Sequence, residues 1–376
     1  MRAAFGPGRW RANAAYRAVP WNRLGAEAGQ ATPPDEDSFG LLLPGDGQDL
    51  PPVAIDRDTA LLFLCLREEG PPPDFVFAGG EAEAERVLHR LLFDSVLELD
   101  HGGRFVTGPA ACETLAMDNE ASQRQPASLV LDALSYGAAL SSAPAAVLAQ
   151  KLYGYNRRPA TPALRRRMPD RASALAFLGL HDGGPVLASI ARFWTRSDDT
   201  SPWLVFLPRQ VAPQPSGQQC KLYVGLAFEE LPDCLPQVAR ELARHRALQF
   251  KIGTDLDGLL RPDKLVAYFA SQEALQAAAQ ALLPVVEGRR VHAVPFTAEI
   301  AGDGRLTWGM DPSDSWLGDR VSWRQFVCER LAAALGAVRA AGAEGTTTWR
   351  LALQRLALEG VDGDSFMPTG AWSGSA

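Results

Sequence analysis

Residues 219–296 alternate between short strand-like segments and amphipathic helical segments, and this pattern constrains the fold more than any other feature. The strand-like segments are rich in β-branched and aromatic residues, whereas the helical ones repeat apolar residues at helical spacing. The predicted strands are Gln219–Leu226, Ala247–Ile252, Lys264–Phe269 and Arg290–Phe296, and the predicted helices are Leu231–His245 and Gln272–Leu283. The pattern therefore predicts a β-sheet flanked by helices.

The C-terminal end of the chain extends this pattern. Thr297–Ile300 and Arg305–Trp308 flank a turn that contains Gly and Asp, which is typical of a hairpin. Helical patterns follow at residues 322–340 and 346–358. Asp311, between the hairpin and the first of these helices, is expected to be a turn or cap residue.

The N-terminal half is organised differently. Residues 1–58 are rich in Pro, Gly and Asp, which predicts an extended or loosely packed lead-in. A helical pattern at Glu81–Phe93 precedes a hairpin signal around Asp100–Gly103, and this succession is the outline of a winged-helix module. Further helices are predicted from Ala127 onward and at residues 145–153, 172–180 and 185–194.

These patterns predict an α+β fold: an N-terminal winged-helix-like and helical half, followed by a mixed β-sheet flanked by helices. We expect a lead-in over residues 1–58, a winged-helix-like plus helical domain over 59–196, an α/β domain over 203–360, and a flexible tail over 361–376.

Composition and motif content exclude several classes of protein. The apolar runs fall short of the roughly 20 residues that a membrane helix needs, and the N-terminus lacks an apolar signal core. We therefore expect a cytoplasmic protein without a membrane partner. The net charge of −7 argues against a broad surface that binds nucleic acid electrostatically. The five cysteines form no CxxC pair, and HExxH and glycine-rich phosphate loops are missing, so neither a metal nor a cofactor is expected.

Lysine is scarce, and three of the four lysines lie in the predicted sheet region. Lys221, Lys251 and Lys264 fall in or beside predicted strands, and Lys221 shares a sheet face with Tyr223 because side chains alternate along a strand. Cations grouped on one face would attract an anion such as phosphate and lower each other's pKa, which frees a neutral Lys as a base. Alternatively, these lysines are edge charges that discourage aggregation.

An arginine-rich segment supplies further cations. Residues 154–167 hold five arginines among prolines, with Arg157 and Arg158 nearest the start. Guanidinium groups on a stiff loop suit the binding of phosphate or carboxylate. The alternative is a solvated loop in an arginine-rich protein.

The lysine segments resemble the phosphothreonine lyases among bacterial type III effectors. One strand of that family reads Lys-Phe-His, and Lys-Leu-Tyr at 221–223 is similar to it. A later strand reads Lys-Val-Thr-Asp, which is similar to Phe-Lys-Ile-Gly-Thr-Asp at 250–255. An Arg follows in that family, as Arg261 does here before a Tyr-Phe strand. The wider layout over residues 148–335 is similar to the HopA-type effector family. Members of that family also occur in peptide natural-product pathways such as those of class V lanthipeptides.

This resemblance implies roles for individual residues. Lys251 matches the base that removes the α-proton of phosphoserine or phosphothreonine, and Lys221 and Arg261 match positions that hold phosphate. Tyr223 stands in the place of the family's general acid, which is a His. A phenol can protonate a leaving group, and neutralisation by Arg and Lys helps phosphate to leave. The further candidates for phosphate binding are Lys264, Arg157 and Arg158.

Two functions are consistent with these observations. The first is a lyase-type maturation protein that acts by β-elimination on a phosphorylated Ser or Thr of a ribosomally made peptide, with a partner kinase supplying the phosphate. The second is a non-catalytic accessory protein that binds the leader, core or product of such a pathway, with the leader added as a strand at Arg104–Thr107. Cations scattered over different faces would instead indicate a protein without a small-molecule site.

Overall fold

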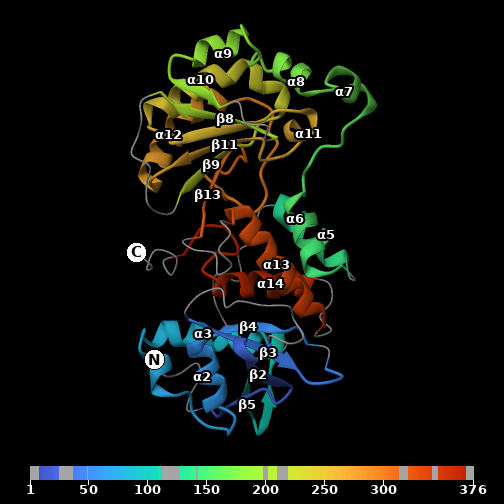
Figure 1. Cartoon of the computed structure of the whole chain (residues 1–376), viewed down its shortest axis with the longest axis vertical. Coiled ribbons are helices and arrows are strands. Elements are labelled where there is room, and N and C mark those ends of the chain that lie inside the picture. Colours follow the sequence, from blue (N-terminus) through green and yellow to red (C-terminus); the bar gives the residue numbers. More distant parts are fainter. Residues whose placement is uncertain are drawn as a thin grey trace.

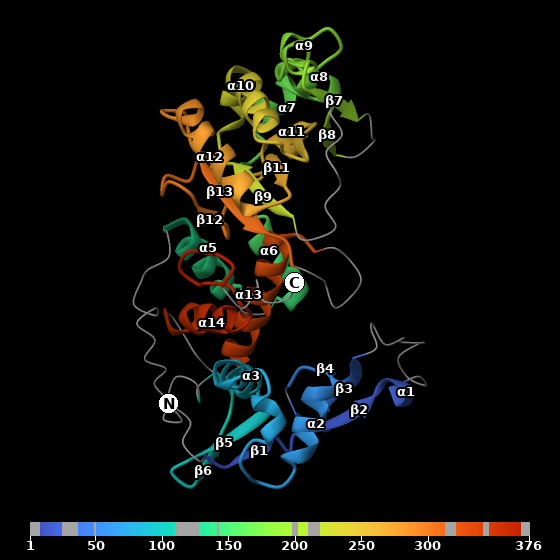
Figure 2. The same ribbon diagram turned by 90° about the vertical axis from the view of Figure 1, so that its left-hand side faces the viewer.

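The computed structural model is an elongated α+β structure with three parts along its longest axis (Figures 1 and 2). The large sheet and its helices lie at one end, a helical part lies in the middle, and the N-terminal strands lie at the other end (Figure 1). The structure describes residues 8–24, 37–48, 50–109, 111, 128–140, 143–197, 202–209, 219–312, 321–340 and 346–369. Within these ranges, no helix is both long and apolar enough to cross a membrane.

The strands of the large sheet lie in the order β12, β13, β9, β11, β10, β8 and β7, and each neighbouring pair is antiparallel. Their bounds are Trp194–Ser197 (β7), Trp203–Pro208 (β8), Cys220–Val224 (β9), Gln249–Gly253 (β10), Leu265–Phe269 (β11), Ala298–Glu299 (β12) and Leu306–Met310 (β13). The strands and the hairpin that hydrophobic alternation predicted at β9 to β13 are therefore confirmed.

Helices cover one face of this sheet (Figure 1). Leu222, Phe250 and Ala267 share one core with the apolar stripes of α10 (Leu231–Arg244) and α12 (Gln272–Val286). Because side chains alternate along a strand, the residues between these apolar ones point to the opposite face. The shorter helices of this part are α7 (Pro162–Arg167), α8 (Arg171–Phe177), η3 (Phe228–Glu230), α9 (Pro185–Ile190) and α11 (Leu256–Leu259).

The middle part is formed by helices that are far apart in the sequence. It contains α5 (Ser128–Ala139), α6 (Ala145–Tyr153), α13 (Trp323–Ala340) and α14 (Thr346–Leu358). Leu152 of α6 and Leu331 of α13 belong to one buried cluster, which also includes Val361 and Phe366. These last two residues lie in the segment expected to be a flexible tail, and both are buried. The domain boundaries expected from the sequence stay predictions.

The N-terminal part contains two small antiparallel sheets. One consists of β1 (Trp10–Ala12), β5 (Leu97–His101) and β6 (Arg104–Val106), and the other of β2 (Tyr16–Pro20), β3 (Ser38–Pro44) and β4 (Val53–Asp56). The helices are α1 (Trp21–Leu24), α2 (Arg57–Cys65), η1 (Asp74–Phe77) and α3 (Glu81–Phe93). The predicted helix and hairpin are present. The described residues of the lead-in instead supply four strands, and Trp10 and Tyr16 of the first two are buried in a core with α2 and α3.

The strand predicted at Arg290–Phe296 does not form, and Val291 makes a single isolated bridge with Leu226. Pro295 has no N–H to donate to a ladder, and Phe296 has a φ of 61°, which is outside the extended region. The apolar pattern alone was therefore misleading here.

Candidate functional site

The face of the large sheet opposite α10 and α12 carries polar and aromatic side chains. Lys221 and Tyr223 of β9 lie on it, as the alternation predicted, and Tyr268 of β11 stands directly across from Lys221. The sequence left open whether the Lys251 strand lies beside β9. In the structure β11 separates them, and the Tyr268 ring centre lies 5.2 Å from Nζ of Lys221 and 5.6 Å from Nζ of Lys251.

Lys251 is the half-buried amine of this face. Its Nζ lies 4.3 Å from the ring centre of Trp203 on β8, and it forms no ion pair with any residue that the structure describes. Burial, together with the positive charges of Lys221 and Arg261, lowers the pKa of Lys251 to about 8. A fraction of Lys251 is therefore neutral near pH 7 and able to accept a proton.

Lys221 is tied to the beginning of helix α13. Its Nζ lies 2.6 Å from Oδ2 of Asp311, and Oδ1 of Asp311 accepts a hydrogen bond from the Trp323 N–H at 2.8 Å. The Trp323 ring packs against Gly309, which pairs with Lys221 on the neighbouring strand. A Cβ at Gly309 would lie 2.2 Å from that ring. Asp311 contacts the helix start as expected, and it also fixes the Lys221 ammonium.

Arg261 belongs to a network of charges that is largely buried. Asp263 accepts hydrogen bonds from Nε and Nη2 of Arg261 at 2.9 and 3.0 Å, and Nη1 of Arg324 lies 2.8 Å from the same carboxylate. The Tyr153 hydroxyl accepts a hydrogen bond from Arg261 at 3.0 Å and donates one to Asp263 at 3.2 Å. Burial would raise the pKa of Asp263, but the two arginines outweigh it and hold that pKa well below its usual range.

The backbone after β10 positions Arg261. Asp255 Oδ1 accepts a hydrogen bond from the Gly258 N–H at 2.6 Å and begins helix α11. Gly253 packs so closely against Gly258 that a Cβ would lie 2.6 Å from the Gly258 carbonyl carbon. The glycine of the Ile-Gly-Thr-Asp segment is therefore required for this turn. The turn brings Cζ of Arg261 to 5.0 Å from the Trp203 ring centre.

Tyr223, which the resemblance placed at the position of a general acid, is only 3% exposed and packs with Val266, Tyr268 and Val294. Burial, and then the negative charge of Asp311, raises its pKa well above the usual value. The phenol therefore keeps its proton and is a weak proton donor.

Lys264 lies outside the group formed by Lys221, Lys251 and Arg261. It is fully buried, and its Nζ donates hydrogen bonds to the carbonyl oxygens of Leu226 at 2.8 Å and Pro262 at 3.3 Å. Burial lowers its pKa to about 7. A bound anion on the open face would not reach this amine.

Arg157 and Arg158 also lie apart from that group. Arg158 forms an ion pair with Glu229, with 2.8 Å between Nη1 and Oε2. Arg157 is exposed and donates a hydrogen bond to the carbonyl oxygen of Asp257 at 2.8 Å. Both side chains bind the surrounding protein rather than facing Lys251.

The residues around the three central cations were not predicted from the sequence; they are Trp203, Tyr268, Asp263, Tyr153, Asp311 and Arg324. Strand alternation was a signal for Tyr268, because it places this residue on one face with Lys264. No local pattern connects Tyr153 and Arg324 to the sheet. Among the described residues, no group of three or more His, Cys, Asp and Glu could hold a metal ion.

No protein-family model and no curated protein sequence matches this chain. Among solved structures it is similar to an effector protein from Pseudomonas syringae pv. tomato, with a TM-score of 0.42 and 12% identity over 67% of this chain and 100% of that chain. An effector from P. syringae pv. syringae gives a TM-score of 0.37 and 13% identity, with 65% and 100% covered. The type III effector/phosphothreonine lyase OspF from Shigella flexneri gives a TM-score of 0.28 and 10% identity, with 45% and 85% covered. At these values the chain is not assigned to a family.

Proposed function

We propose that this chain is a lyase that removes phosphate from a phosphorylated Ser or Thr of a peptide by β-elimination. The main support is Lys251, a half-buried amine whose pKa is lowered to about 8. Lys221 and Arg261 lie near it on the same side of the sheet, and their positive charges contribute to that shift. Elimination of phosphate needs a base beside a site for an anion, and these three residues provide both.

In the proposed reaction, the neutral Nζ of Lys251 takes the proton from Cα of the phosphorylated residue. The electron pair of that C–H bond forms the Cα=Cβ double bond, while the Cβ–O bond breaks and its electrons leave with phosphate. The products are a dehydroamino acid, inorganic phosphate and protonated Lys251, which returns its proton to solvent. The step balances without an oxidant, a reductant or a cofactor.

The leaving phosphate is neutralised mainly by Lys221 and Arg261 in this proposal. Asp311 and Asp263 fix the two cations, which still have N–H groups to donate, since Lys carries three and Arg five. Tyr223 has a secondary role as proton donor, because its raised pKa makes the phenol a weak acid.

The proposed substrate is a ribosomally made peptide that a partner kinase phosphorylates in the cytoplasm, within a peptide natural-product pathway. Trp203, Lys251 and Arg261 are only half-buried, so a side chain presented by a peptide can approach the amine from solvent. The similarity of residues 148–335 to the HopA-type effector family, members of which also occur in such pathways, supports the same class of substrate.

The test is incubation of the purified protein with phosphothreonine and phosphoserine peptides, including a neighbouring-gene peptide phosphorylated by its kinase. Mass spectrometry would follow the loss of phosphoric acid, and a thiol would trap the dehydroamino acid. We expect elimination by the wild type and by Lys151→Ala, an exposed control on α6, but not by Lys251→Ala. Elimination that persists in Lys251→Ala, or that fails with all of these peptides, would contradict the proposal.

Binding without chemistry is the second candidate function. It is favoured by one observation: Tyr223 is buried and holds its proton tightly, so the strongest acid expected from the resemblance is missing. Under this alternative, Lys251→Ala leaves peptide affinity unchanged, and removal of the β6 edge at Arg104–Thr107 abolishes it. Fluorescence anisotropy with a labelled precursor peptide distinguishes the two functions.

A further inference from the structure

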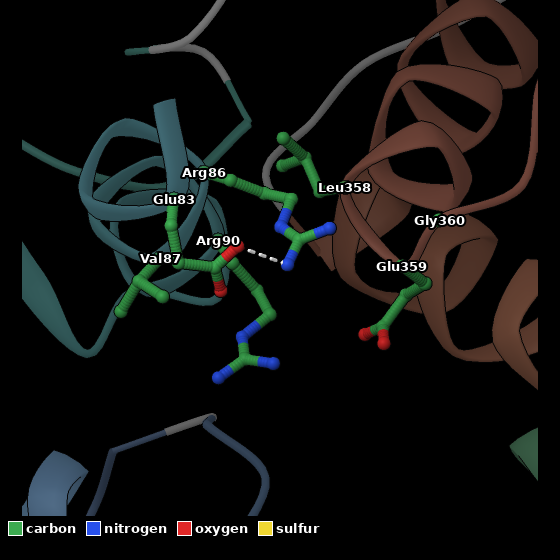
Figure 3. Close-up of a pocket in the computed structure, with 7 residues that line it drawn as sticks. All are labelled: Glu83, Arg86, Val87, Arg90, Leu358, Glu359 and Gly360. Carbon is green, nitrogen blue, oxygen red and sulfur yellow. Dashed lines mark hydrogen bonds and ion pairs between the residues drawn. The ribbon is translucent and has the colours of Figure 1, made fainter. Parts of the chain in front are cut away.

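The pocket between helices α3 and α14 is lined by charges that balance (Figure 3). Two arginines, Arg86 and Arg90, and two glutamates, Glu83 and Glu359, line it. Arg86 donates a hydrogen bond to Glu83, and Glu359 lies within the positive charge of Arg90. No net charge is therefore left there for a ligand, and we assign none to this pocket.

The polar face of the large sheet differs, because its charges do not balance. Lys221 forms an ion pair with Asp311 at 2.6 Å, and Arg261 and Arg324 share the carboxylate of Asp263 at 2.9 and 2.8 Å. These three cations and two carboxylates leave one net positive charge when the proposed base is neutral. A bound monoanion completes the balance, whereas a phosphate ester dianion brings one negative charge more than these residues offset.

The hydroxyl groups described near this face are weak proton donors. Burial is the largest cause that raises the pKa values of Tyr223, Tyr268 and Tyr153 above the ordinary value for tyrosine. The Tyr153 hydroxyl also donates a hydrogen bond to Asp263 at 3.2 Å. A leaving group that needs a proton is therefore served poorly, and one that needs none is favoured.

A sulfate ester has both properties that this site favours. The ester of a Ser or Thr side chain with sulfate carries one negative charge at neutral pH, whereas the ester with phosphate carries about 1.5 to 2. Sulfate leaves as a dianion without any proton, but phosphate leaves without one only as a trianion. Both esters present tetrahedrally arranged oxygens, so the N–H groups of Lys221 and Arg261 can donate to either.

We propose that the site also eliminates sulfate from a sulfate ester of Ser or Thr in a peptide. Nζ of Lys251 takes the Cα proton, and the electron pair of that bond forms the Cα=Cβ double bond. The Cβ–O bond breaks, and its electrons leave with sulfate. The products are a dehydroamino acid, sulfate and protonated Lys251, and no oxidant, reductant or cofactor is consumed. The inference rests on the proposed lyase function, because both reactions use the same base.

The test uses pairs of peptides of identical sequence that carry either a phosphate or a sulfate ester on the same Thr. The neighbouring-gene peptide supplies the sequence, and both esters are introduced by chemical synthesis. The full chain is incubated with each peptide, a thiol traps the dehydroamino acid, and mass spectrometry follows the products. We expect elimination from both peptides. For the sulfate ester, kcat/KM should rise with pH to a plateau above the pKa of Lys251, about 8.

One pair of variants connects the reaction to the proposed base. Lys251→Ala is expected to lose both eliminations, because neither ester loses its Cα proton without the amine. Lys151→Ala, the exposed control on α6, is expected to keep both. Circular dichroism melting verifies that each variant is folded.

Two further variants test why sulfate is accepted. Asp311→Asn removes one negative charge and keeps an oxygen for the Trp323 N–H. The ratio of phosphate to sulfate elimination should then rise about tenfold or more, because the added net positive charge favours the dianion. Tyr223→Phe removes the weak proton donor that only phosphate needs. It should lower the same ratio by up to about 10²-fold, the low end of the contribution of a general acid.

The outcomes separate this inference from the lyase function itself. Loss of phosphate without loss of sulfate from the paired peptide would overturn the inference and leave the lyase function standing. Loss of neither would overturn both. Sulfate elimination that persists in folded Lys251→Ala would place the reaction outside this site and overturn the inference. So would a product with a restored hydroxyl in place of the double bond, or an unchanged ratio in folded Asp311→Asn.

Discussion

The large sheet holds two lysines with lowered pKa values, and these lysines differ in what surrounds the amine. Lys251, with a pKa of about 8, is half-buried between the rings of Trp203 and Tyr268. Lys264, with a pKa of about 7, is fully buried and donates to two backbone carbonyls. The larger shift belongs to the lysine that no substrate reaches. Access to solvent, rather than the pKa alone, therefore separates a candidate base from a structural amine.

The causes of the two shifts also differ. Burial is the largest cause for both, but Lys251 is additionally flanked by the positive charges of Lys221 and Arg261. Those charges are the ones that would hold a phosphate. Asp263 opposes the shift of both lysines, since its negative charge raises both pKa values. The comparison can therefore be tested by substitution of Lys251, of Lys264 and of Asp263, whose charge acts on both lysines.

The largest expected effect separates the two lysines by activity. Lys251→Met should lower the rate of phosphate elimination by about 10²–10⁴-fold, the usual contribution of a general base. Lys264→Met should leave the rate close to that of the wild type, because its amine is fully buried and donates to two backbone carbonyls. Phosphate release measured for both variants tests whether Lys251 or Lys264 is the base. A folded Lys264→Met variant that is as slow as Lys251→Met would reverse the assignment.

The next effect is on stability and comes from Asp263, which both lysines share. Asp263→Asn should lower the free energy of unfolding by about 3–5 kcal/mol, because it leaves the buried charge of Arg324 without its carboxylate. Arg324 is only 1% exposed, so water cannot replace that partner. Urea denaturation measures the loss, and Asp233→Asn, at an exposed position of α10, is the control. A change no larger than that control would show that the network contributes little.

The elements around these lysines could be predicted because hydrophobic periodicity is local. The helix expected at residues 231–245 is observed at Leu231–Arg244, and the helix expected at residues 346–358 has the same bounds in the structure. Alternation placed Lys221 and Tyr223 on one face for the same reason. The failure at residues 290–296 came from Pro295 and a positive φ, which outweigh an apolar pattern.

The composition of the site depends on pairing between distant segments, which no local pattern encodes. Because β11 lies between β9 and β10, Tyr268 stands between Lys221 and Lys251. Nη2 of Arg324 donates to the carbonyl oxygen of Tyr153 at 2.8 Å, although these residues are 171 positions apart. Full burial of Lys264 likewise became visible only in the folded chain.

Lys264→Met provides a smaller, pH-dependent effect. It should destabilise the protein by about 1–3 kcal/mol at high pH, because the carbonyl groups of Leu226 and Pro262 lose their donor. The folded pKa of Lys264, about 7, lies below the ordinary value of 10.5, so the unfolded chain binds the proton first as pH falls. Its contribution to stability is therefore complete above pH 10.5 and falls between there and pH 7. Denaturation across this range should show that the free energy of unfolding of the wild type rises relative to that of the variant as pH rises. A constant difference between the two free energies would contradict the lowered pKa.

The smallest expected effect is a shift of the pH profile through Lys221. Removing its positive charge in Lys221→Met should raise the pKa of Lys251, because one of the charges that disfavour the ammonium form is gone. The rise of kcat/KM with pH should then move to higher pH, apart from any fall in the plateau caused by weaker phosphate binding. Lys264 does not have Lys221 among its electrostatic neighbours, so the pH dependence of stability should stay unchanged in this variant. A lowered plateau with an unmoved midpoint would show that Lys221 only binds phosphate. A shift of both properties would show that the two lysines are coupled and that the separation drawn between them does not hold.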